Sequence, residues 1–582
     1  MRDSVPRPEH PRPQFVRDRW ANLNGAWTFG FDFADSGLDD GRELYRSRGF
    51  DREITVPFAP ESRLSGVGYT DFIPAMWYHR TIRIPDSWEG QRILLHFGAV
   101  DYESEAFVDG RPVGLHFGGS SPFDLDITGR VRRGANHDLV VRVRDRLRPA
   151  GSQPGGKQSP KYQSHGCYYT RTTGIWQTVW LEAAGLHGLR DAQVGPDLDG
   201  GRLICTPRFH ATGRGHRFGV QVTADGKTVA SAQAEAVSGN PVELRLESVR
   251  AWSPEDPFLY DIQYTVADAS GKVIDRVESY AGLRKLHVEG GTFFLNNRPR
   301  YQRLVLDQGF YPDGIWTAPS DAALKRDIEL AMQAGFNGAR LHQKVFEERF
   351  HYWADRLGYL TWGEYTSWGC DPNNPAATGK MLAELGSIVV RDRNHPSIIA
   401  WTPWNETDKV TDRLEHDRAH VEAYELCKAL DPTRPVNDAS GYVHRRTDLW
   451  TVHCYEPDAK ALAEKLTPGA DGQVWRNHPE IEVDYGGQPY IVDEFGGIKW
   501  IPPSEKAYAE NSWGYGHAPA STEEVCARLE ALVDALLGLK HVGGYCYTQL
   551  TDVEQEQNGI FKFDRSEKFD MERIRRIFSR QR

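Results

Sequence analysis

The segment from residue 304 to residue 364 decides the fold, because it alternates short strands with helices. In order, it reads Leu304-Val305-Leu306, a helix opened by Ser320-Asp321 and closed at Gly335, Asn337-Gly338-Ala339-Arg340-Leu341-His342, a helix at 346–357, and Tyr359-Leu360-Thr361-Trp362-Gly363-Glu364. Serine and aspartate favour the first position of a helix, and glycine favours its end. Strands that alternate with helices are typical of a parallel sheet covered by those helices.

The same rhythm continues to the end of the chain. Further candidate strands are Ile398–Trp404, Val436–Ala439, Leu449–Tyr455, Tyr490–Glu494 and Gly544–Leu550. Eight strands in the roughly 297 residues from 286 to 582 predict a (β/α)8 TIM barrel, whose active site forms at the C-terminal ends of the strands. A doubly wound sheet is the alternative, but it normally has a glycine-rich phosphate loop after its first strand, and this chain has none.

The first half of the chain reads as β-structure in two blocks. Runs such as Arg92–Phe97 and Asp138–Val143 are short, apolar and bounded by turn residues, and this spacing continues to Trp176–Leu181. We therefore expect one β-domain over residues 1–185. The second block, residues 186–285, has the size of an immunoglobulin-like sandwich.

Composition limits the class of protein and its partners. The chain has 582 residues, enough for two to four domains, and a net charge of −11 without any block of Lys and Arg, so nucleic acid and anionic membranes are poor candidate partners. Its seven cysteines are scattered and contain no CxxC pair, so we predict no metal site, disulfide framework or cofactor. No signal-like or membrane-spanning apolar run is present, and a cytoplasmic location is the expectation.

Two predicted strands end in glutamates that could act as a catalytic pair. The fourth strand ends in Trp401-Thr402-Pro403-Trp404-Asn405-Glu406, and the seventh ends in Ile491-Val492-Asp493-Glu494-Phe495-Gly496-Gly497. Glycoside hydrolysis needs one protonated carboxylic acid, which helps the leaving oxygen depart, and one ionised carboxylate, which attacks the sugar. Two carboxylates that face each other across a barrel mouth can provide both forms near neutral pH.

The competing interpretation is that both glutamates are ordinary solvated carboxylates, as most of the 81 acidic residues must be. Glu406 stands out because Asn405 could hold a sugar hydroxyl and Trp404 could stack on a sugar ring. Glu494 stands out because it lies at the end of an apolar strand, just before the turn at Gly496-Gly497. Asp493 competes for the role of nucleophile, but alternation along a strand directs it to the opposite face from Glu494.

On these motifs the chain resembles the family 2 glycoside hydrolases, which include β-galactosidases, β-glucuronidases and β-mannosidases. The resemblance rests on Arg19–Trp27, Tyr78-His79-Arg80-Thr81, Gly174-Ile175-Trp176, His395–Trp401 with Asn405-Glu406, and Asp493-Glu494-Phe495-Gly496. It covers essentially the whole chain and implies a jelly-roll sugar-binding-type domain (1–185), an immunoglobulin-like sandwich (186–285) and a catalytic TIM barrel (286–582).

The resemblance also implies residue roles. Glu406 is the expected acid/base and Glu494 the expected nucleophile of a retaining exo-glycosidase, with a covalent glycosyl–Glu494 intermediate and carboxyl groups about 5–5.5 Å apart. Arg340 matches an arginine that could keep the nucleophile ionised, and Tyr455 a tyrosine that hydrogen-bonds it. Further candidate sugar contacts at strand ends, each of which could equally be structural, are Asp307, His342, Glu364, His453, Tyr547 and Gln549.

Departures from the family pattern bear on the substrate. Uronidases of the family bind a carboxylate with an Asn-x-Lys pair before Gly-Ile-Phe, whereas this chain has Glu556-Gln557-Asn558-Gly559-Ile560-Phe561, and Glu556 would repel a uronic acid. The Glu-x-His magnesium pair of the large β-galactosidases is replaced by Glu364-Tyr365-Thr366, and the aspartate that the jelly-roll contributes is replaced near Tyr168. We therefore expect a neutral sugar, a β-galactoside or a furanoside such as an α-L-arabinofuranoside.

Several alternatives stay open. β-Galactofuranosidase and β-mannosidase specificities are possible within the family, and β-glucuronidase is less favoured. A transglycosylase would use the same residues and pass the sugar to an acceptor other than water. A carbohydrate-binding protein that has lost catalysis is disfavoured by the presence of both glutamates. The expected partner is a glycoside or oligosaccharide substrate, and self-association into a homo-oligomer is left open.

Overall fold

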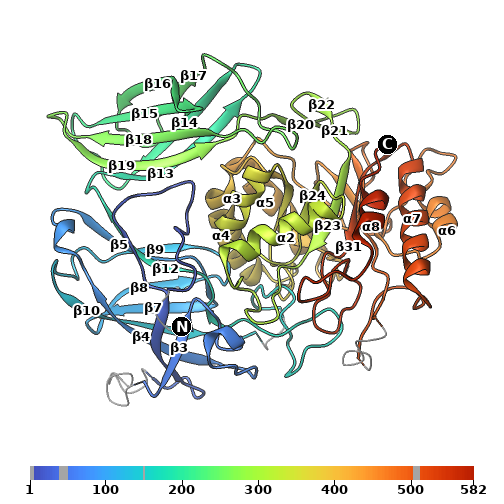
Figure 1. Ribbon diagram of the computed structural model, residues 1–582, viewed down its shortest axis with the longest axis horizontal. Coiled ribbons are helices and arrows are strands. Elements are labelled where there is room, and N and C mark those ends of the chain that lie inside the picture. Colours follow the sequence, from blue (N-terminus) through green and yellow to red (C-terminus); the bar gives the residue numbers. More distant parts are fainter. Residues whose placement is uncertain (1–4, 38–49, 148–150, 503–510) are drawn as a thin grey trace.

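The structure is a computed structural model that describes residues 5–37, 50–147, 151–502 and 511–582. Figure 1 shows three bodies: a β-sandwich in blue, a pair of green sheets above it, and a barrel with helices in yellow to red beside them. The two sandwiches and the TIM barrel are the architecture that the sequence predicts. The N-terminal segment also crosses between bodies, because Val16 pairs with Glu278 of the second sandwich.

The first body is a sandwich of two antiparallel sheets, with apolar side chains filling the space between them. Its four-stranded sheet has the order β1 (Trp20–Asn22), β12 (Val179–Ala184), β5 (Arg92–Phe97) and β9 (Phe123–Asp126). Its six-stranded sheet has the order β3 (Arg52–Val56), β2 (Gly25–Phe31), β4 (Ala75–Arg83), β10 (Asn136–Arg144), β7 (Glu103–Val108) and β8 (Arg111–Phe117). The short pair β6 (Val100–Asp101) and β11 (Gly174–Ile175) lies beside them.

The second body is the immunoglobulin-like sandwich, with sheets of three and four antiparallel strands. These are β13 (Leu189–Asp197), β14 (Arg202–Phe209) and β17 (Val242–Arg245), and then β16 (Lys227–Glu235), β15 (Arg217–Ala224), β18 (Tyr260–Ala267) and β19 (Val273–Ala281). The buried guanidinium of Arg17 pairs with Glu182 of the first sandwich and with Asp275 of the second, at 2.9 Å. Removal of Arg17 would leave two buried carboxylates without the cation that pairs with both.

The barrel follows a small sheet of β20 (Leu286–Glu289), β21 (Thr292–Leu295) and β22 (Arg298–Pro299). Its seven-stranded parallel sheet has the order β26 (Ile398–Thr402), β25 (Leu360–Glu364), β24 (Gly338–Leu341), β23 (Gln302–Asp307), β31 (Val542–Thr548), β30 (Tyr490–Gly496) and β29 (Trp450–Cys454). Between the two ends of this sheet lies the short parallel pair β27 (Trp404–Asn405) and β28 (Ala439–Ser440). The fifth barrel strand is thus only two residues long.

The barrel helices are α2 (Asp321–Gln333), α3 (Glu348–Leu357), α4 (Pro375–Asp392), α5 (Arg413–Leu430), α6 (Ala459–Leu466), α7 (Thr522–Gly538) and α8 (Met571–Phe578). Helix α2 begins as predicted, since the Ser320 side chain accepts a hydrogen bond from the Ala323 amide. It buries Leu324 and Ile328 against the barrel and is followed by Gly335 at φ +100°. The predicted helix at 346–357 begins two residues later, at Glu348.

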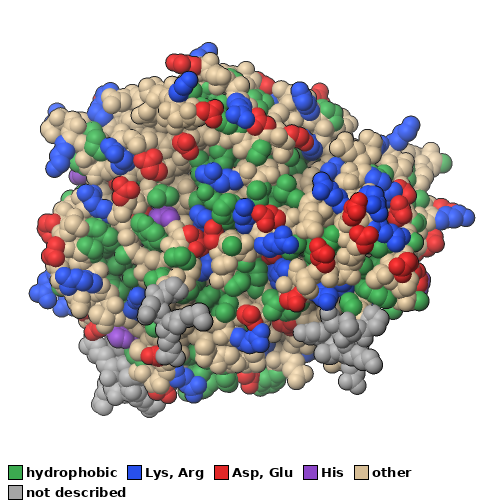
Figure 2. Space-filling view, viewed as in Figure 1, with side chains coloured by type: hydrophobic (Ala, Val, Ile, Leu, Met, Phe, Trp, Pro, Cys, Tyr) green, Lys and Arg blue, Asp and Glu red, His purple; other side chains and the backbone are tan. Residues whose placement is uncertain are grey.

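The visible face of the molecule carries Lys and Arg side chains interspersed with Asp and Glu (Figure 2). This agrees with a net charge that is spread along the chain. Among the described residues, no helix is both long and apolar enough to cross a membrane.

Candidate active site

Glu494 lies in the barrel mouth, near the end of β30, and is held by three polar side chains. Arg340 Nη1 donates to its Oε1 at 2.9 Å, the Tyr455 hydroxyl donates to its Oε2 at 2.5 Å, and His453 Nε2 lies 3.4 Å from Oε1. Glu494 is only 5% exposed. Burial alone would raise its pKa, but the positive charges of His453 and Arg340 outweigh it and hold the pKa well below its usual value. Glu494 is therefore ionised at neutral pH.

Arg340, on β24, is completely buried and orders the floor of the site. Its Nε donates to Glu364 Oε2 at 2.6 Å, and its Nη2 donates to Asn405 Oδ1 at 2.9 Å and to His342 Nδ1 at 2.6 Å. Burial would raise the pKa of Glu364, but Arg340 and His342 lower it to about 2. Burial lowers the pKa of His342 to about 4, which leaves its ring neutral and able to accept from the arginine.

Glu406 lies in the turn after β27, in a different environment. Its backbone is left-handed, at φ +51°, a conformation that a residue with a side chain adopts at a cost of about 1 kcal/mol or more and that clusters at functional sites. The turn is held by the Glu406 amide, which donates to the Ser440 carbonyl at 3.1 Å. The side chain is 19% exposed and lines a cavity of about 500 Å³ together with Tyr168, Trp368 and Tyr442.

His453, at the end of β29, joins the two glutamates. Its Nδ1 lies 2.8 Å from Glu406 Oε1, and its Nε2 lies 3.0 Å from Ser440 Oγ. One carboxylate oxygen of Glu406, one of Glu494 and a ring nitrogen of His453 all lie within 4.8 Å of one another. A divalent cation could span such a group. We assign none, because His453 already bonds to Glu406 and Glu494 already accepts from Arg340 and Tyr455.

The geometry brings most of the predicted site residues together. Glu406, Glu494, Asn405, Arg340, Tyr455, His342, Glu364 and His453 form one connected group of polar contacts. The Asn405 amide nitrogen is buried and has no hydrogen-bond partner in the described part of the chain. Both oxygens of Glu364 are occupied within the protein, by Arg340 and by the Gln343 amide, so Glu364 supports Arg340.

Three further predicted sugar contacts have their polar contacts within the protein. Trp404 is fully buried, its indole donates to the Ala419 carbonyl at 3.4 Å, and alternation along β27 turns it away from the Asn405 face. Tyr547 is likewise a core side chain of β31 whose hydroxyl donates to the Asn558 carbonyl at 3.2 Å. The Asp307 carboxylate accepts from the Gly309 amide at 2.9 Å and shapes the turn after β23. That these three residues contact sugar stays a prediction.

Gln549 belongs to a closed ring of hydrogen bonds beside the site. The ring runs from Glu556 to Tyr169, Gln308, Gln549, Asn558 and back to Glu556. Tyr169 comes from the first sandwich, so the ring fastens that domain to the barrel. Burial raises the pKa of Glu556.

A loop of the first sandwich reaches the barrel mouth near Tyr168, and it carries Lys157, which sequence reasoning missed. The amides of Gly155 and Gly156 donate to the Trp368 carbonyl at 2.7 and 3.0 Å, and the Lys157 ammonium lies 4.5 Å from the centre of the Trp368 ring. Gly156 has φ +56°, and a Cβ there would lie 2.2 Å from the Gln343 carbonyl oxygen, so only glycine fits. No local sequence signal identifies Lys157, because its partners lie about 200 residues away.

Ser440 and Tyr442 were missed for a different reason. They follow the predicted strand Val436–Ala439, so the rule that active sites form at strand ends would have found them. The Tyr515 ring, which stacks on Tyr455 at 3.4 Å between centroids, lies outside any strand and carries no such signal.

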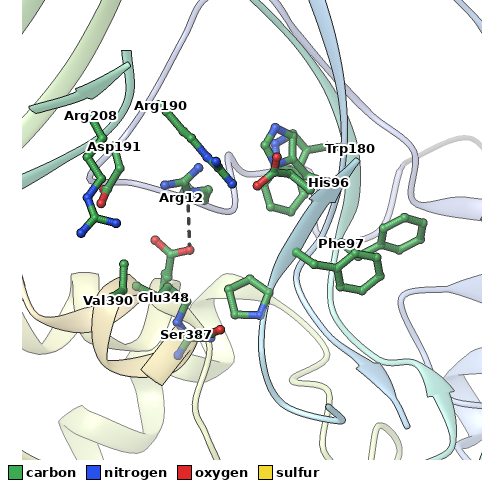
Figure 3. Close-up of a pocket in the computed structure, with 14 residues that line it drawn as sticks. Arg12, His96, Phe97, Trp180, Arg190, Asp191, Arg208, Glu348, Ser387 and Val390 are labelled. Atoms are coloured by element: carbon green, nitrogen blue, oxygen red, sulfur yellow. Dashed lines mark ion pairs between the residues drawn. The ribbon is translucent and has the colours of Figure 1, made fainter. Parts of the chain in front are cut away.

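A separate cavity of about 330 Å³ lies where the three bodies meet (Figure 3). Arg190 and Arg208 come from the immunoglobulin-like sandwich, His96 and Trp180 from the first sandwich, and Glu348 from α3, with Arg12 of the N-terminal segment 3.8 Å from Glu348. None of the residues that line this cavity belongs to the group around Glu406 and Glu494.

Comparisons with known proteins agree with this geometry. Three models of glycosyl hydrolases family 2 match the chain. The sugar binding domain matches residues 20–154, and the TIM barrel domain matches residues 287–497. A third model, described simply as glycosyl hydrolases family 2, matches residues 209–284 between them. A β-glucuronidase of Paenibacillus borealis is 24% identical over 83% of this chain and 84% of its own. A β-galactosidase of Thermoanaerobacter pseudethanolicus is 22% identical over 75% of this chain and 57% of its own.

Among solved structures, the β-glucuronidase of Ruminococcus gnavus in complex with D-glucuronic acid superposes with a TM-score of 0.79. It is 20% identical, and the match covers 98% of this chain and all of that chain. At this identity the likeness shows the shared fold.

Proposed function

Because this chain belongs to family 2 of the glycosyl hydrolases, it is a glycoside hydrolase that acts on O-glycosyl bonds, and we propose that it is a retaining exo-glycosidase specific for a terminal neutral sugar. The observation that carries the proposal is the pairing of Glu406 and Glu494, whose nearest ligand oxygens lie within 4.8 Å of one another. Retaining glycosidases place their two carboxyl groups about 5–5.5 Å apart, whereas inverting enzymes need about 6.5–9.5 Å to admit a water.

The reaction takes two displacements. Glu494 attacks the anomeric carbon, the bond from that carbon to the leaving oxygen breaks, and the leaving oxygen takes the bond's electron pair and a proton from Glu406. A water then attacks the same carbon, gives a proton to Glu406, and releases Glu494 with its electron pair. The contacts of Arg340 and Tyr455 with Glu494 favour its ionised form, which the first displacement requires.

Two features support removal of a single terminal sugar. Glu494 is 5% exposed and is not among the residues that line the cavity of about 500 Å³, whereas Glu406 lines it. A sugar that contacts Glu494 therefore occupies the buried end of the site, and the leaving group extends into the cavity.

The neutral sugar is supported by the ring around Glu556. Glu556 occupies the place where uronidases of the family are expected to hold the asparagine of their Asn-x-Lys pair, and Asn558 the place of the lysine. Tyr169 and Asn558 both donate to the Glu556 carboxylate and hold it in place. The carboxylate therefore cannot easily turn away from the carboxylate of a uronic acid, which it would repel. A β-galactoside is the first candidate, and α-L-arabinofuranoside, β-galactofuranoside and β-mannoside follow.

A β-glucuronide is a second candidate, favoured by Lys157. The buried Lys157 ammonium lies over Trp368, and although burial would lower its pKa, Cys167, Glu556 and the two candidate catalytic glutamates raise it. A cation in this position could pair with a uronic carboxylate. The relatives named β-glucuronidase point in the same direction.

A panel of aryl glycosides tests the proposal. The native chain and Glu494→Gln are given the β-galactoside, β-glucuronide, β-mannoside, β-glucoside, β-galactofuranoside and α-L-arabinofuranoside, and chromophore release is measured. Turnover of one neutral glycoside that the variant loses supports the proposal, and NMR of the first-formed anomer reports retention. Turnover confined to the β-glucuronide would replace the neutral sugar, an inverted product would exclude the double displacement, and transfer to added sugar acceptors would indicate a transglycosylase.

A further inference from the structure

His453 is more tightly held than a residue that only contacts a sugar hydroxyl. It is 4% exposed, and its backbone exchanges two hydrogen bonds with the Asn477 side chain, at 3.1 and 3.0 Å. The ring lies against Gly441, where an added Cβ would come within 2.5 Å of it, and 5.4 Å from the centre of the Tyr442 ring. The ring therefore has one orientation, with Nδ1 toward Glu406 and Nε2 toward Ser440.

The direction of the hydrogen bonds fixes the protons on this ring. Ser440 Oγ donates to Asp493 Oδ2 at 2.6 Å, so the same oxygen must accept from His453 Nε2–H at 3.0 Å. When Glu406 is ionised, its Oε1 can only accept, so Nδ1 must carry a hydrogen as well. Both ring nitrogens then donate, which makes the ring an imidazolium cation.

The charged groups around the ring agree with this state. Those that face it are Glu406 from the turn after β27, Asp493 and Glu494 from β30, and Arg340 from β24, which contacts both carboxylates of β30. Ser440, at the end of β28, and Tyr442, two residues further on, are also beside the ring. Burial would lower the pKa of His453, but Glu494, Asp493 and Glu406 outweigh it and raise the pKa.

We propose that His453 is a positioning residue that acts through Glu406: as an imidazolium it holds Glu406 Oε1 and stabilises the carboxylate that forms when Glu406 gives its proton to the leaving group. The inference rests on the proposed role of Glu406 as acid/base. A hydrogen bond from a cation to an anion is roughly twice as strong as one between neutral groups, so the contact strengthens as the proton departs.

The first displacement shows where the contact acts. As the bond from the anomeric carbon to the leaving oxygen breaks, the proton on the Glu406 oxygen that does not contact His453 moves to the leaving oxygen. The negative charge left on Glu406 forms 2.8 Å from the His453 cation, through its other oxygen. A leaving group that departs unaided, such as 2,4-dinitrophenolate, makes little use of this proton, whereas an alkoxide leaving group depends on it.

The test measures kcat and KM of His453→Asn on a set of glycosides of one sugar, from the 2,4-dinitrophenyl to the methyl glycoside. We expect kcat/KM to fall about 10–100-fold for the poorest leaving groups, the equivalent of one charge-assisted hydrogen bond, and less than about 3-fold for 2,4-dinitrophenyl. Because the variant acid holds its proton more firmly, the alkaline limb of kcat/KM should move to higher pH. Ser440→Ala, which removes the acceptor for Nε2–H, should give a smaller effect with the same dependence on the leaving group.

The matched control is His478→Asn. His478 also lies beside the Tyr442 ring, but its side chain contacts Glu480, at 3.3 Å. The control variant should leave the dependence on the leaving group unchanged. An equal loss of kcat/KM for every leaving group in His453→Asn, with an unmoved alkaline limb, would overturn the proposal.

Two further measurements separate this inference from the proposed function. Glu406→Gln run on the same glycosides reports whether Glu406 is the acid; if it shows no dependence on the leaving group, the proposed function fails first. NMR titration of the His453 ring needs no turnover. A ring that is still protonated well above pH 6.5 supports the proposal, and a ring that is neutral at pH 6.5 contradicts it.

Discussion

The end of β30 and the turn after β27 each present one glutamate to the same small space, but they hold it differently. The Glu494 side chain is 6% exposed and accepts from Arg340 and Tyr455. The Glu406 side chain is 19% exposed, stands on a left-handed backbone and contacts both the His453 imidazole and the Tyr442 hydroxyl. One site is built to keep a negative charge, and the other leaves a carboxyl group room to exchange a proton.

The two side chains are chemically identical. Their different roles, nucleophile and acid/base, must therefore come from the residues around them. A nucleophile must stay ionised in a buried place, which requires several donors around it. An acid/base must reach the leaving oxygen and, later, a water, which requires access to the cavity. The next four experiments alter one side of the comparison at a time.

Glu494→Gln should have the largest effect. An amide cannot attack the anomeric carbon, so we expect kcat to fall on the order of 10⁴-fold or more for every leaving group, including 2,4-dinitrophenyl. Steady-state rates on the preferred aryl glycoside measure this. Asp493→Asn is the comparison, and a smaller loss is expected there because the Asp493 carboxylate is fully buried and accepts from Ser440. A larger loss in Asp493→Asn would exchange the two roles.

Glu406→Gln should have an intermediate effect that depends on the leaving group. General acid catalysis contributes about 10²–10⁴-fold to the rate. The rate of the first displacement should therefore fall by that factor for glycosides with poor leaving groups, and much less for the 2,4-dinitrophenyl glycoside. Added azide, which needs no base, should restore part of the second displacement and yield a glycosyl azide with retained configuration. A uniform loss without rescue by azide would contradict the acid/base assignment.

Tyr455→Phe should have a smaller effect, because it removes one of the donors to Glu494. The loss of a charge-assisted hydrogen bond predicts a fall in kcat of about 10–100-fold, with little change in KM. Tyr485→Phe is the control, since its hydroxyl donates to the Gln488 carbonyl, away from Glu494. Equal effects of the two variants would show that Tyr455 acts through packing alone.

Glu364→Gln tests the buried contact between Glu364 and Arg340 by its effect on the free energy of unfolding at acid pH. The folded pKa of Glu364, about 2, lies below its usual 4.5, so its stabilising contribution is complete above pH 4.5 and is lost as pH falls toward 2. The variant should therefore lose less stability than the native chain over that range, by up to about 1.4 kcal/mol per pH unit.

Urea unfolding at pH 4.5, 4.0 and 3.5 measures this slope. Glu425→Gln, whose carboxylate is about half exposed and pairs with Arg446, should keep the native slope. A Glu364→Gln slope equal to the native one would mean that Arg340 does not hold Glu364 ionised.

Local sequence patterns predicted the barrel, both sandwiches and the residues at strand ends. The cap at Ser320, the strand before Glu494 and the polar ends of the strands are local features, and the structure has each of them. The direction of individual side chains was harder to predict. Trp404 and Tyr547 lie beside functional strand ends but point into the core, which a pattern of residue types cannot show for a two-residue strand or a strand buried on both faces.

The remaining parts of the site depend on contacts between distant segments. Lys157 reaches the site only because the loop around Gly156 docks on the Trp368 carbonyl, and Tyr169 closes the ring around Glu556 from another domain. The close approach of His453 to Glu406 likewise depends on how two strand ends converge. These placements follow from domain packing, for which the sequence carries no local signal.

Trapping the intermediate tests the central claim, that Glu494 attacks the sugar, most directly. The native chain is incubated with the 2-deoxy-2-fluoro aryl derivative of the glycoside it prefers, digested, and its peptides are sequenced by mass spectrometry. The account predicts a fluorosugar attached to the side chain of Glu494, and no adduct in Glu494→Gln. An adduct on Asp493 or Glu406, or turnover with no adduct on any residue, would contradict it.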